Sequence, residues 1–382
     1  MNVANYLDQH FQEVYGLYQG IVNISSQSYD KEGIDRVGAM IADFMVQKGF
    51  TVETCCNPIA GNGLLIHSNS QGSGKRIVLL AHMDTVHKKG NFPEPLFREE
   101  SSTAYGPGVL DCKGGIAVGI LTMLALRDCG YSAPITFILA PDEEVSFARS
   151  GQKGIDFIKD NVQNADYVMV LESGTRNKLV TGRKGVIRYE ITVHGKASHA
   201  GQSYDLGISA VKEACHKILA LEQNSNSDYG ITYNCGIISG GEIPNSVPQL
   251  CKFVLDVRFK NPEQEREAIA TVENIVNTAF LAGTSSEMKL LSQRDAMEET
   301  DGNIALFRLL QQISQEYGLE ELSSYVSGGA SDASFSSAMG IPTVCGMGIV
   351  GSSQHTLREE ADISSIKQRS TLLGNTMFAL NP

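Results

Sequence analysis

The sequence lacks three features, and each absence excludes a class of protein. It has no run of about 18 apolar residues, so it offers no candidate transmembrane helix. It has no excess of basic residues, since 31 Lys and Arg stand against 43 Asp and Glu for a net charge of −12, and a nucleic-acid backbone would mostly be repelled. Its eight cysteines form no CxxC pair, and a chain of 382 residues needs no disulfide framework to hold a core. We therefore expect a protein with reduced thiols that binds neither membranes nor nucleic acids.

The N-terminus lacks a secretory signal. Residues 1–19 mix polar side chains with apolar ones at helical spacing, and they have neither a basic start nor a continuous apolar core. Together with the cysteine pattern this predicts a cytoplasmic protein. The alternative is a mature chain from which a signal has been removed.

The first half of the chain has the pattern of an α/β domain. Hydrophobic residues make up 42% of the chain and charged residues 19%, which is ordinary for a globular protein. Short apolar runs alternate with helical patterns, which predicts a mostly parallel sheet flanked by helices. These stretches are residues 77–81, 116–126, 135–140, 155–158 and 167–171.

The pattern changes near residue 185 and changes back after residue 301. The intervening part contains half-polar strands and two helical patterns, which predict a small α+β unit covered on one face. The strands are residues 186–193, 231–238 and 252–259, and the helices are residues 208–221 and 262–281. We expect a discontinuous catalytic domain of residues 1–183 and 297–382 with an inserted domain of residues 184–296.

Residues that can bind metal ions follow several of the apolar runs. Because the carboxyl ends of parallel strands border the ligand crevice of an open α/β sheet, these side chains are expected to converge. Taken singly, each is better explained as a solvated loop charge or a core histidine, but their shared placement favours a site. The residues are His82, Asp84, Asp142, Glu143, Glu144, Glu172 and His355.

Asp84 and Asp111 have different expected roles. Successive side chains alternate across a strand, so Asp84 and His82 suit a pair in which the carboxylate holds the ring better than a pair that binds one ion. Asp111 lies between two glycine turns directly before a helical pattern, where the backbone can approach a ligand closely. The alternative for Asp111 is a helix N-cap. Cys112 is interpreted as a buried bystander.

Nine motifs in order resemble the dinuclear zinc peptidase and deacylase family, which includes glutamate carboxypeptidases, aminoacylases, acetylornithine deacetylases and succinyl-diaminopimelate desuccinylases. HMDTV, the GPG loop and the TVHKKG stretch are most similar to glutamate carboxypeptidases. One departure is the residue pair Val145 and Ser146, which stands where the family usually has a glycine. The motifs are LLAHMDTV (79–86), YGPGVLDCKGG (105–115), APDEE (140–144), LESGT (171–175), GKASHAG (195–201), IPNSVP (243–248), LDVR (255–258), SGGASDA (327–333) and QHT (354–356).

The resemblance implies a fold and a set of metal ligands. The fold is a phosphorylase/hydrolase-like zinc peptidase domain with an inserted α+β lid and dimerisation domain. His82 and Glu172 would bind one metal ion, Glu144 and His355 the other, and Asp111 would bridge them. The bond from Asp111 to Cys112 matches a cis non-proline peptide of the family.

The charge balance agrees with two divalent ions. Three carboxylates and a bridging hydroxide would neutralise the four positive charges of two such ions, whereas without metal the carboxylates would repel one another. Oxygen and imidazole ligands suit zinc, and also cobalt or manganese. We expect zinc.

The resemblance also assigns roles in catalysis. Glu143 matches the general base, and Asp84 matches the residue that supports His82. His199 matches a histidine that reaches the active site of the partner subunit and stabilises the oxyanion, so a homodimer is expected. The alternative for His199 is a capping or core histidine.

Further residues match groups that bind the substrate. Asn245 and Arg258 would hold the substrate near the cleaved bond and at its α-carboxylate, and Gly328 and Gly329 would line the pocket. An arginine can bind a terminal carboxylate with two hydrogen bonds, as an exopeptidase requires. Two basic residues would favour an acidic C-terminal residue, although ordinary surface charges are the alternative for both, as for Arg258. These two are Lys178 and Arg294.

We interpret the chain as a metallo-exopeptidase that hydrolyses the amide bond to a C-terminal, acidic amino acid. The first alternative is an N-acyl amino acid deacylase, which would use the same metals and base. The second is a non-catalytic binding protein on the same scaffold. The expected substrate is therefore a small peptide or an N-acyl amino acid.

Overall fold

The computed structural model describes residues 3–68 and 72–381. The chain forms two compact units. The first unit comprises Met1–Gly182, Glu299–Val326 and Ser331–Pro382, and the second comprises Arg183–Glu298 and Ser327–Ala330. Within the described residues, no helix combines the length and apolar character that crossing a membrane requires.

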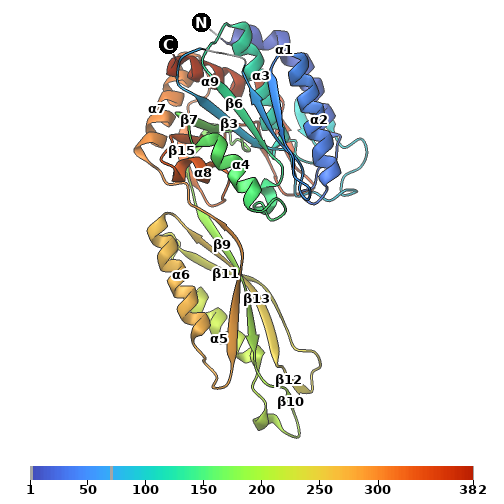
Figure 1. The fold of residues 1–382 in the computed structure, drawn as a ribbon, viewed down its shortest axis with the longest axis vertical. Helices are drawn as coiled ribbons and strands as arrows, with labels where there is room; N and C mark the ends of the chain where they lie inside the picture. Colours follow the sequence, from blue (N-terminus) through green and yellow to red (C-terminus); the bar gives the residue numbers. More distant parts are fainter. Residues whose placement is uncertain (1–2, 69–71, 382) are drawn as a thin grey trace. The chain divides into compact units, whose positions relative to one another are not determined.

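The first unit is built on an eight-stranded mixed sheet (Figure 1). Its four central strands, β6, β3, β7 and β16, run parallel to one another, whereas β1, β2 and β8 pair antiparallel with their neighbours. In sheet order the strands are β1 (Thr51–Cys55), β2 (Gly63–His67), β6 (Ile135–Ala140), β3 (Ile77–His82), β7 (Tyr167–Val170), β16 (Thr343–Cys345), β8 (Lys178–Arg183) and β15 (Ser323–Ser327).

The central strands are buried along their whole length because they are apolar throughout. Every residue of β3 and β6 is buried, as expected for parallel strands covered on both faces. Helix α3 is buried from Lys113 to Leu126 and packs with α1 and α9, while α4 and α8 pack together near β6 and β16. The helices of this unit are α1 (Ala4–Val22), α2 (Lys31–Gln47), α3 (Lys113–Asp128), α4 (Gln152–Val162), α7 (Asp301–Glu316), α8 (Ala333–Ala338) and α9 (Ser364–Leu380).

The first unit also contains a small second sheet. Its strands pair in the order β17, β18, β5 and β4, and all pairs are antiparallel. The strands are β4 (Arg98–Glu100), β5 (Thr103–Tyr105), β17 (Val350–Ser352) and β18 (Glu360–Asp362). This sheet brings residues 353–359, between β17 and β18, close to the segment that follows β5.

The second unit is an antiparallel sheet with two helices. The strand order is β11, β13, β9 and β14, and alternate residues of β13 are buried against α5 and α6. A pair of short strands, β10 and β12, forms a separate ladder. The elements are β9 (Gly185–His194), β10 (Ser198–His199), α5 (Ala210–Glu222), β11 (Thr232–Gly240), β12 (Ser246–Val247), β13 (Leu250–Phe259), α6 (Pro262–Asn277) and β14 (Ser285–Arg294).

The predicted fold class is confirmed, and two departures from the predicted elements of the second unit have a clear physical cause. The helix predicted for residues 262–281 ends at Asn277, because the buried Lys217 ammonium binds the carbonyls of Ile275, Val276 and Thr278 and so closes the last turn. Strand β14 was not predicted, because it is a polar edge strand that buries few of its side chains.

Candidate metal centre

The carboxyl edge of the parallel strands brings the predicted metal-binding residues together. His82 is the last residue of β3 and lies beside Ala140, the last residue of β6. Glu143 and Glu144 follow β6 in a short 3₁₀ helix, η1 (Glu143–Val145), and Glu172 follows β7 by two residues. The placement follows from the apolar runs, since each strand ends within one residue of the end of its apolar run.

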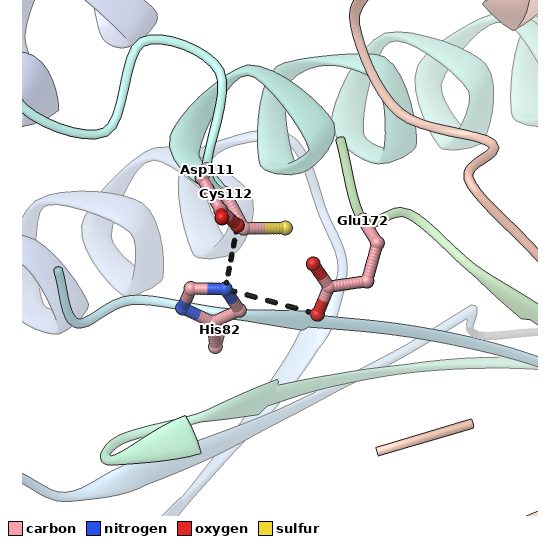
Figure 2. Close-up of side chains that lie close together, drawn as sticks. All are labelled: His82, Asp111, Cys112 and Glu172. Atoms are coloured by element: carbon pink, nitrogen blue, oxygen red, sulfur yellow. Dashed lines mark hydrogen bonds and ion pairs between the residues drawn. The ribbon is translucent and has the colours of Figure 1, made fainter. Parts of the chain in front are cut away.

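The first cluster consists of His82, Asp111 and Glu172 (Figure 2). His82 Nε2 lies 3.2 Å from Asp111 Oδ1 and 3.8 Å from Glu172 Oε1, and the ring is only 1% exposed. Cys112 also lies in this cluster, but its thiol donates a hydrogen bond to the Leu171 carbonyl at 3.1 Å, and burial raises its pKa well above the usual value. Because the Leu171 carbonyl engages the thiol, we assign the two carboxylates and the imidazole as the donors of this cluster.

The second cluster consists of Asp111, Glu144 and His355. His355 Nε2 lies 3.3 Å from Asp111 Oδ2 and 3.2 Å from Glu144 Oε2. The two oxygens of Asp111 therefore face different histidines, one in each cluster. This is the arrangement that a bridging carboxylate requires.

Asp84 contacts the first cluster through Nδ1 of His82. It is fully buried, and His82 Nδ1 hydrogen-bonds to its backbone carbonyl at 3.0 Å and lies 3.2 Å from its Oδ1. The same carboxylate accepts hydrogen bonds from the backbone N–H groups of Glu143 at 3.0 Å and Glu144 at 3.2 Å, and from the Ser28 hydroxyl at 2.7 Å. Asp84 thus orients the ring and fixes the turn that carries both glutamates.

The two clusters perturb the ionisation of their own members. Burial acts to raise the pKa of Asp111, but hydrogen bonds from His355 and His82 hold it well below the usual range. Hydrogen bonds to Asp111 and Glu144 raise the pKa of His355 to about 11. Burial raises the pKa of Glu144 to about 8, against the opposing effect of His355. Glu144 and His355 thus retain protons where cations would bind, and this oxygen and imidazole donor set fits two divalent ions.

Backbone strain marks two positions at this site. Ser146, at the place where the family usually has a glycine, has φ +53, and the following Phe147 has φ +59. His355 also adopts a left-handed conformation, with φ +62. Such conformations are uncommon for residues other than glycine and concentrate at functional sites. The chain therefore keeps the turn after Glu144 without the glycine. The bond between Asp111 and Cys112 is cis, as the resemblance implied.

His199 and Asn245 lie side by side in the second unit. His199, in β10, pairs with Ser246 of β12, and the carbonyl of Asn245 accepts the N–H of Ala200. His199 Nδ1 accepts the N–H groups of Gly201 at 3.1 Å and Gln202 at 3.0 Å. The ring therefore caps this turn and is exposed, so the core alternative is wrong for it. Because Nδ1 is an acceptor, the neutral ring carries its proton on Nε2, where it can donate.

Arg258 is held by a carboxylate that the sequence analysis did not single out. Its Nε lies 2.6 Å from Asp256 Oδ1 and its Nη2 lies 3.0 Å from Asp256 Oδ2, while its Nη1 lies 3.5 Å from the Gly328 carbonyl. Burial acts to raise the pKa of Asp256, but the Arg258 hydrogen bond lowers it. The Gly329 carbonyl accepts from Arg183 at 3.1 Å. The segment 327–330 and Arg258 thus belong to one cationic region of the second unit. The Asp-x-Arg spacing in LDVR was the available signal for Asp256.

The two basic residues expected near an acidic side chain differ in exposure. Lys178 is exposed at the start of β8, in the first unit. Arg294 is 3% exposed at the end of β14, in the second unit, so the alternative of an ordinary surface charge is wrong for Arg294. That alternative stays open for Lys178.

Comparison with known proteins agrees with these features. A model of the peptidase dimerisation domain matches residues 181–284. Carboxypeptidase G2 from Pseudomonas sp. (strain RS-16) is 30% identical over 360 residues, which cover 91% of this chain and 85% of that relative. Aminopeptidase PepT from Bacillus cereus ATCC 10987 has a similar structure, with a TM-score of 0.80 at 19% identity over 97% of this chain and 99% of its own. The M20 family metallo-carboxypeptidase Sso-CP2 from Sulfolobus solfataricus has a TM-score of 0.78 at 16% identity over 96% and 98%.

Exchange of Asp111 for asparagine should weaken both metal sites, because each oxygen of its carboxylate faces one cluster. In Asp111→Asn we expect the affinity for Zn²⁺ to fall at least about tenfold at both sites, as measured by titration calorimetry with metal analysis. The matched control is Cys112→Ser, which should retain both ions. Loss of only one ion in Asp111→Asn would contradict the shared role.

Metal binding should release protons. At about pH 7.5 His355 of the metal-free protein carries a proton, since its pKa is raised to about 11, and a ligand imidazole must be neutral. Titration with Zn²⁺ in buffers of different ionisation enthalpy should therefore report release of about one proton or more per chain. A binding enthalpy that is independent of the buffer would rule this out.

Proposed function

The chain belongs to the M20 peptidase family and is a hydrolase of peptide bonds, and on this basis we propose that it is a dinuclear metal-dependent carboxypeptidase that releases an acidic C-terminal residue. The observation that carries the proposal is the Asp111 carboxylate, whose two oxygens face His82 and His355. In this proposal His82 and Glu172 hold one ion, Glu144 and His355 hold the other, and Asp111 bridges them.

Zinc is the metal that we propose, and cobalt or manganese would suit the same donors. When bound, the two ions would polarise the scissile carbonyl and make water an effective nucleophile near neutral pH. The role of the protein side chains would be to hold the ions at fixed positions. Buried His82, fixed by Asp84, serves this purpose because its ring cannot turn without losing the Nδ1 contact.

Glu143 is the proposed general base. It precedes the proposed ligand Glu144 directly, and its backbone N–H is fixed by Asp84 at 3.0 Å. Its carboxylate would take the proton from the attacking water and pass it to the leaving amine. The same residue thus acts first as a base and then as an acid.

Arg258 supports the choice of a carboxypeptidase. An arginine can bind the free α-carboxylate of a C-terminal residue, and an internal peptide bond offers no such charge. Asp256 holds the guanidinium in one orientation, next to Gly328 and Gly329. Asn245 would contact the substrate near the cleaved bond. Lys178 and Arg294 would bind the acidic side chain.

We further propose that residues 184–296 act as a lid and dimerisation domain of a homodimer. The match of residues 181–284 to the peptidase dimerisation domain supports this. So do the exposed apolar side chains on the edge strands, since Ile237 of β11 is 63% exposed and Leu290 of β14 is 50% exposed. In the dimer, His199 would donate a hydrogen bond from its Nε2–H to the oxyanion in the partner's active site.

Replacement of the proposed base should remove activity and leave the metals in place. In Glu143→Gln we expect kcat to fall by about 10² to 10⁴ with two ions still bound, because the carboxylate handles the proton and is not a ligand. Steady-state kinetics and metal analysis of the same sample measure both. A Glu143→Ala enzyme that keeps its metal and full activity would refute the assignment.

A substrate series should separate the carboxypeptidase from the deacylase. A dipeptide or folyl conjugate ending in glutamate should be cleaved, while the C-terminally amidated dipeptide should lose roughly 10- to 100-fold in kcat/KM because Arg258 has no carboxylate to bind. An N-acetyl amino acid is the comparison substrate. If the acidic substrates are not turned over and the N-acetyl amino acid is, the protein is a deacylase.

Mixing two inactive variants should restore activity if His199 serves the partner subunit. A heterodimer of Glu143→Ala and His199→Ala subunits contains one site with both groups, so random exchange at equal amounts should give about a quarter of wild-type activity. Activity is measured after subunit exchange, and association by sedimentation. No gain on mixing, with exchange shown to be complete, would place His199 in its own subunit's site or outside catalysis.

A further inference from the structure

Glu359 is a buried carboxylate that the proposed reaction does not use. It lies between His355 and strand β18, and it is 1% exposed. Its Oε1 accepts the backbone N–H groups of Leu110 at 2.9 Å and Asp111 at 3.0 Å, and its Oε2 accepts the N–H of Gly108 at 3.2 Å. One carboxylate therefore binds three backbone donors of the loop that presents Asp111.

His87 provides the fourth donor. Its Nε2 lies 2.7 Å from Glu359 Oε2, and the ring is 6% exposed and packs edge-on against Phe92. Since the oxygen is an acceptor, Nε2 carries the proton in this contact. His87 follows Asp84 by three residues. Glu359 therefore connects three segments of the chain. The first carries His82 and Asp84, the second carries Asp111, and the third, which contains Glu359 itself, carries His355.

The surroundings of Glu359 provide the donors that a buried carboxylate requires. Burying an ionised carboxylate is costly unless donors surround it, and hydrogen bonds to a charged acceptor are stronger than those between neutral groups. The buried Lys113 follows this loop, and its Nζ donates to the Ile24 carbonyl at 2.9 Å.

The loop needs such an anchor. Gly106 has φ +150 and Gly108 has φ +79, so the backbone before Asp111 is built on conformations that glycine permits and does not enforce. The direction of the Asp111 side chain decides whether its two oxygens face one cluster or both. Fixing the N–H groups of residues 108, 110 and 111 on one acceptor group removes the freedom of the loop to turn.

We propose that Glu359, completed by His87, is a positioning residue of the metal centre that holds the Asp111 backbone so that its carboxylate spans both metal sites. The proposal rests on the proposed metal centre and adds a requirement to it: metal affinity must depend on a residue that contacts no metal. Loss of such partners around metal ligands typically lowers affinity or activity 10- to 100-fold.

The direct test is Glu359→Gln, which keeps the shape and replaces one acceptor oxygen with an NH₂ group. We expect Zn²⁺ affinity to fall about 10- to 100-fold, and the visible spectrum of the Co²⁺-loaded protein to change because the ligand geometry changes. The matched control is Glu360→Gln, the same exchange at the next residue, whose Oε1 instead accepts the Ser352 hydroxyl at 2.8 Å. The control should bind both metals as the wild type does.

A second variant and a second readout cover the case in which Glu359→Gln does not fold. His87→Phe keeps a ring against Phe92 and removes only the donor. In the metal-free protein, the amides of Leu110 and Asp111 should exchange with solvent at least about tenfold faster in this variant than in the wild type, as measured by hydrogen exchange. Zn²⁺ affinity should fall as well, by a smaller factor.

The outcomes separate this inference from the proposed function. If either variant loses thermal stability but binds Zn²⁺ within about twofold of the wild type, with an unchanged Co²⁺ spectrum, Glu359 is only structural and the inference is wrong. If the wild type itself binds no metal, the proposed function fails. In that case, amide exchange in His87→Phe still tests whether Glu359 and His87 hold the Asp111 backbone. Unchanged exchange would overturn this, and faster exchange would support it.

Discussion

The Asp111 carboxylate is the group on which the rest of the site depends, because one oxygen faces His82 and the other faces His355. No other described side chain belongs to both clusters. The surrounding structure restricts the position of this carboxylate. Asp84 sets His82 on one side, and Glu359 binds the backbone of Asp111 itself at 3.0 Å. In the proposed centre, two metal sites would share a ligand because three separate segments of the chain are fixed against one another.

Electrostatics explain why such an arrangement calls for cations. Asp111, Glu144 and Glu172 converge at a buried edge of the sheet, where like charges repel and desolvation penalises each ionised carboxylate. In the metal-free protein the balance is kept by protons, with the pKa of Glu144 raised to about 8 and that of His355 raised to about 11. Divalent ions replace those protons. The overall acid surplus of the chain contributes little to this local requirement.

Apolar runs made the central part of the structure predictable from the sequence. Residues 77–81 and 135–140 are buried on both faces, so their strands were recognisable and the polar residues that follow them marked the site. Contacts between distant segments were not predictable in this way. Glu359 binds N–H groups about 250 residues earlier in the chain, and Lys217 ends a helix 60 residues later. No local sequence pattern indicates either contact, because each depends on how elements that are distant in the sequence pack together.

The measurement that tests the account most directly is a crystal structure of the zinc-loaded protein with anomalous scattering at the zinc edge. We expect two peaks about 3.5 to 4 Å apart, one beside His82 and Glu172 and the other beside Glu144 and His355, with one Asp111 oxygen on each. A single peak, or two peaks with both Asp111 oxygens on the same ion, would contradict the shared carboxylate and with it the proposed centre.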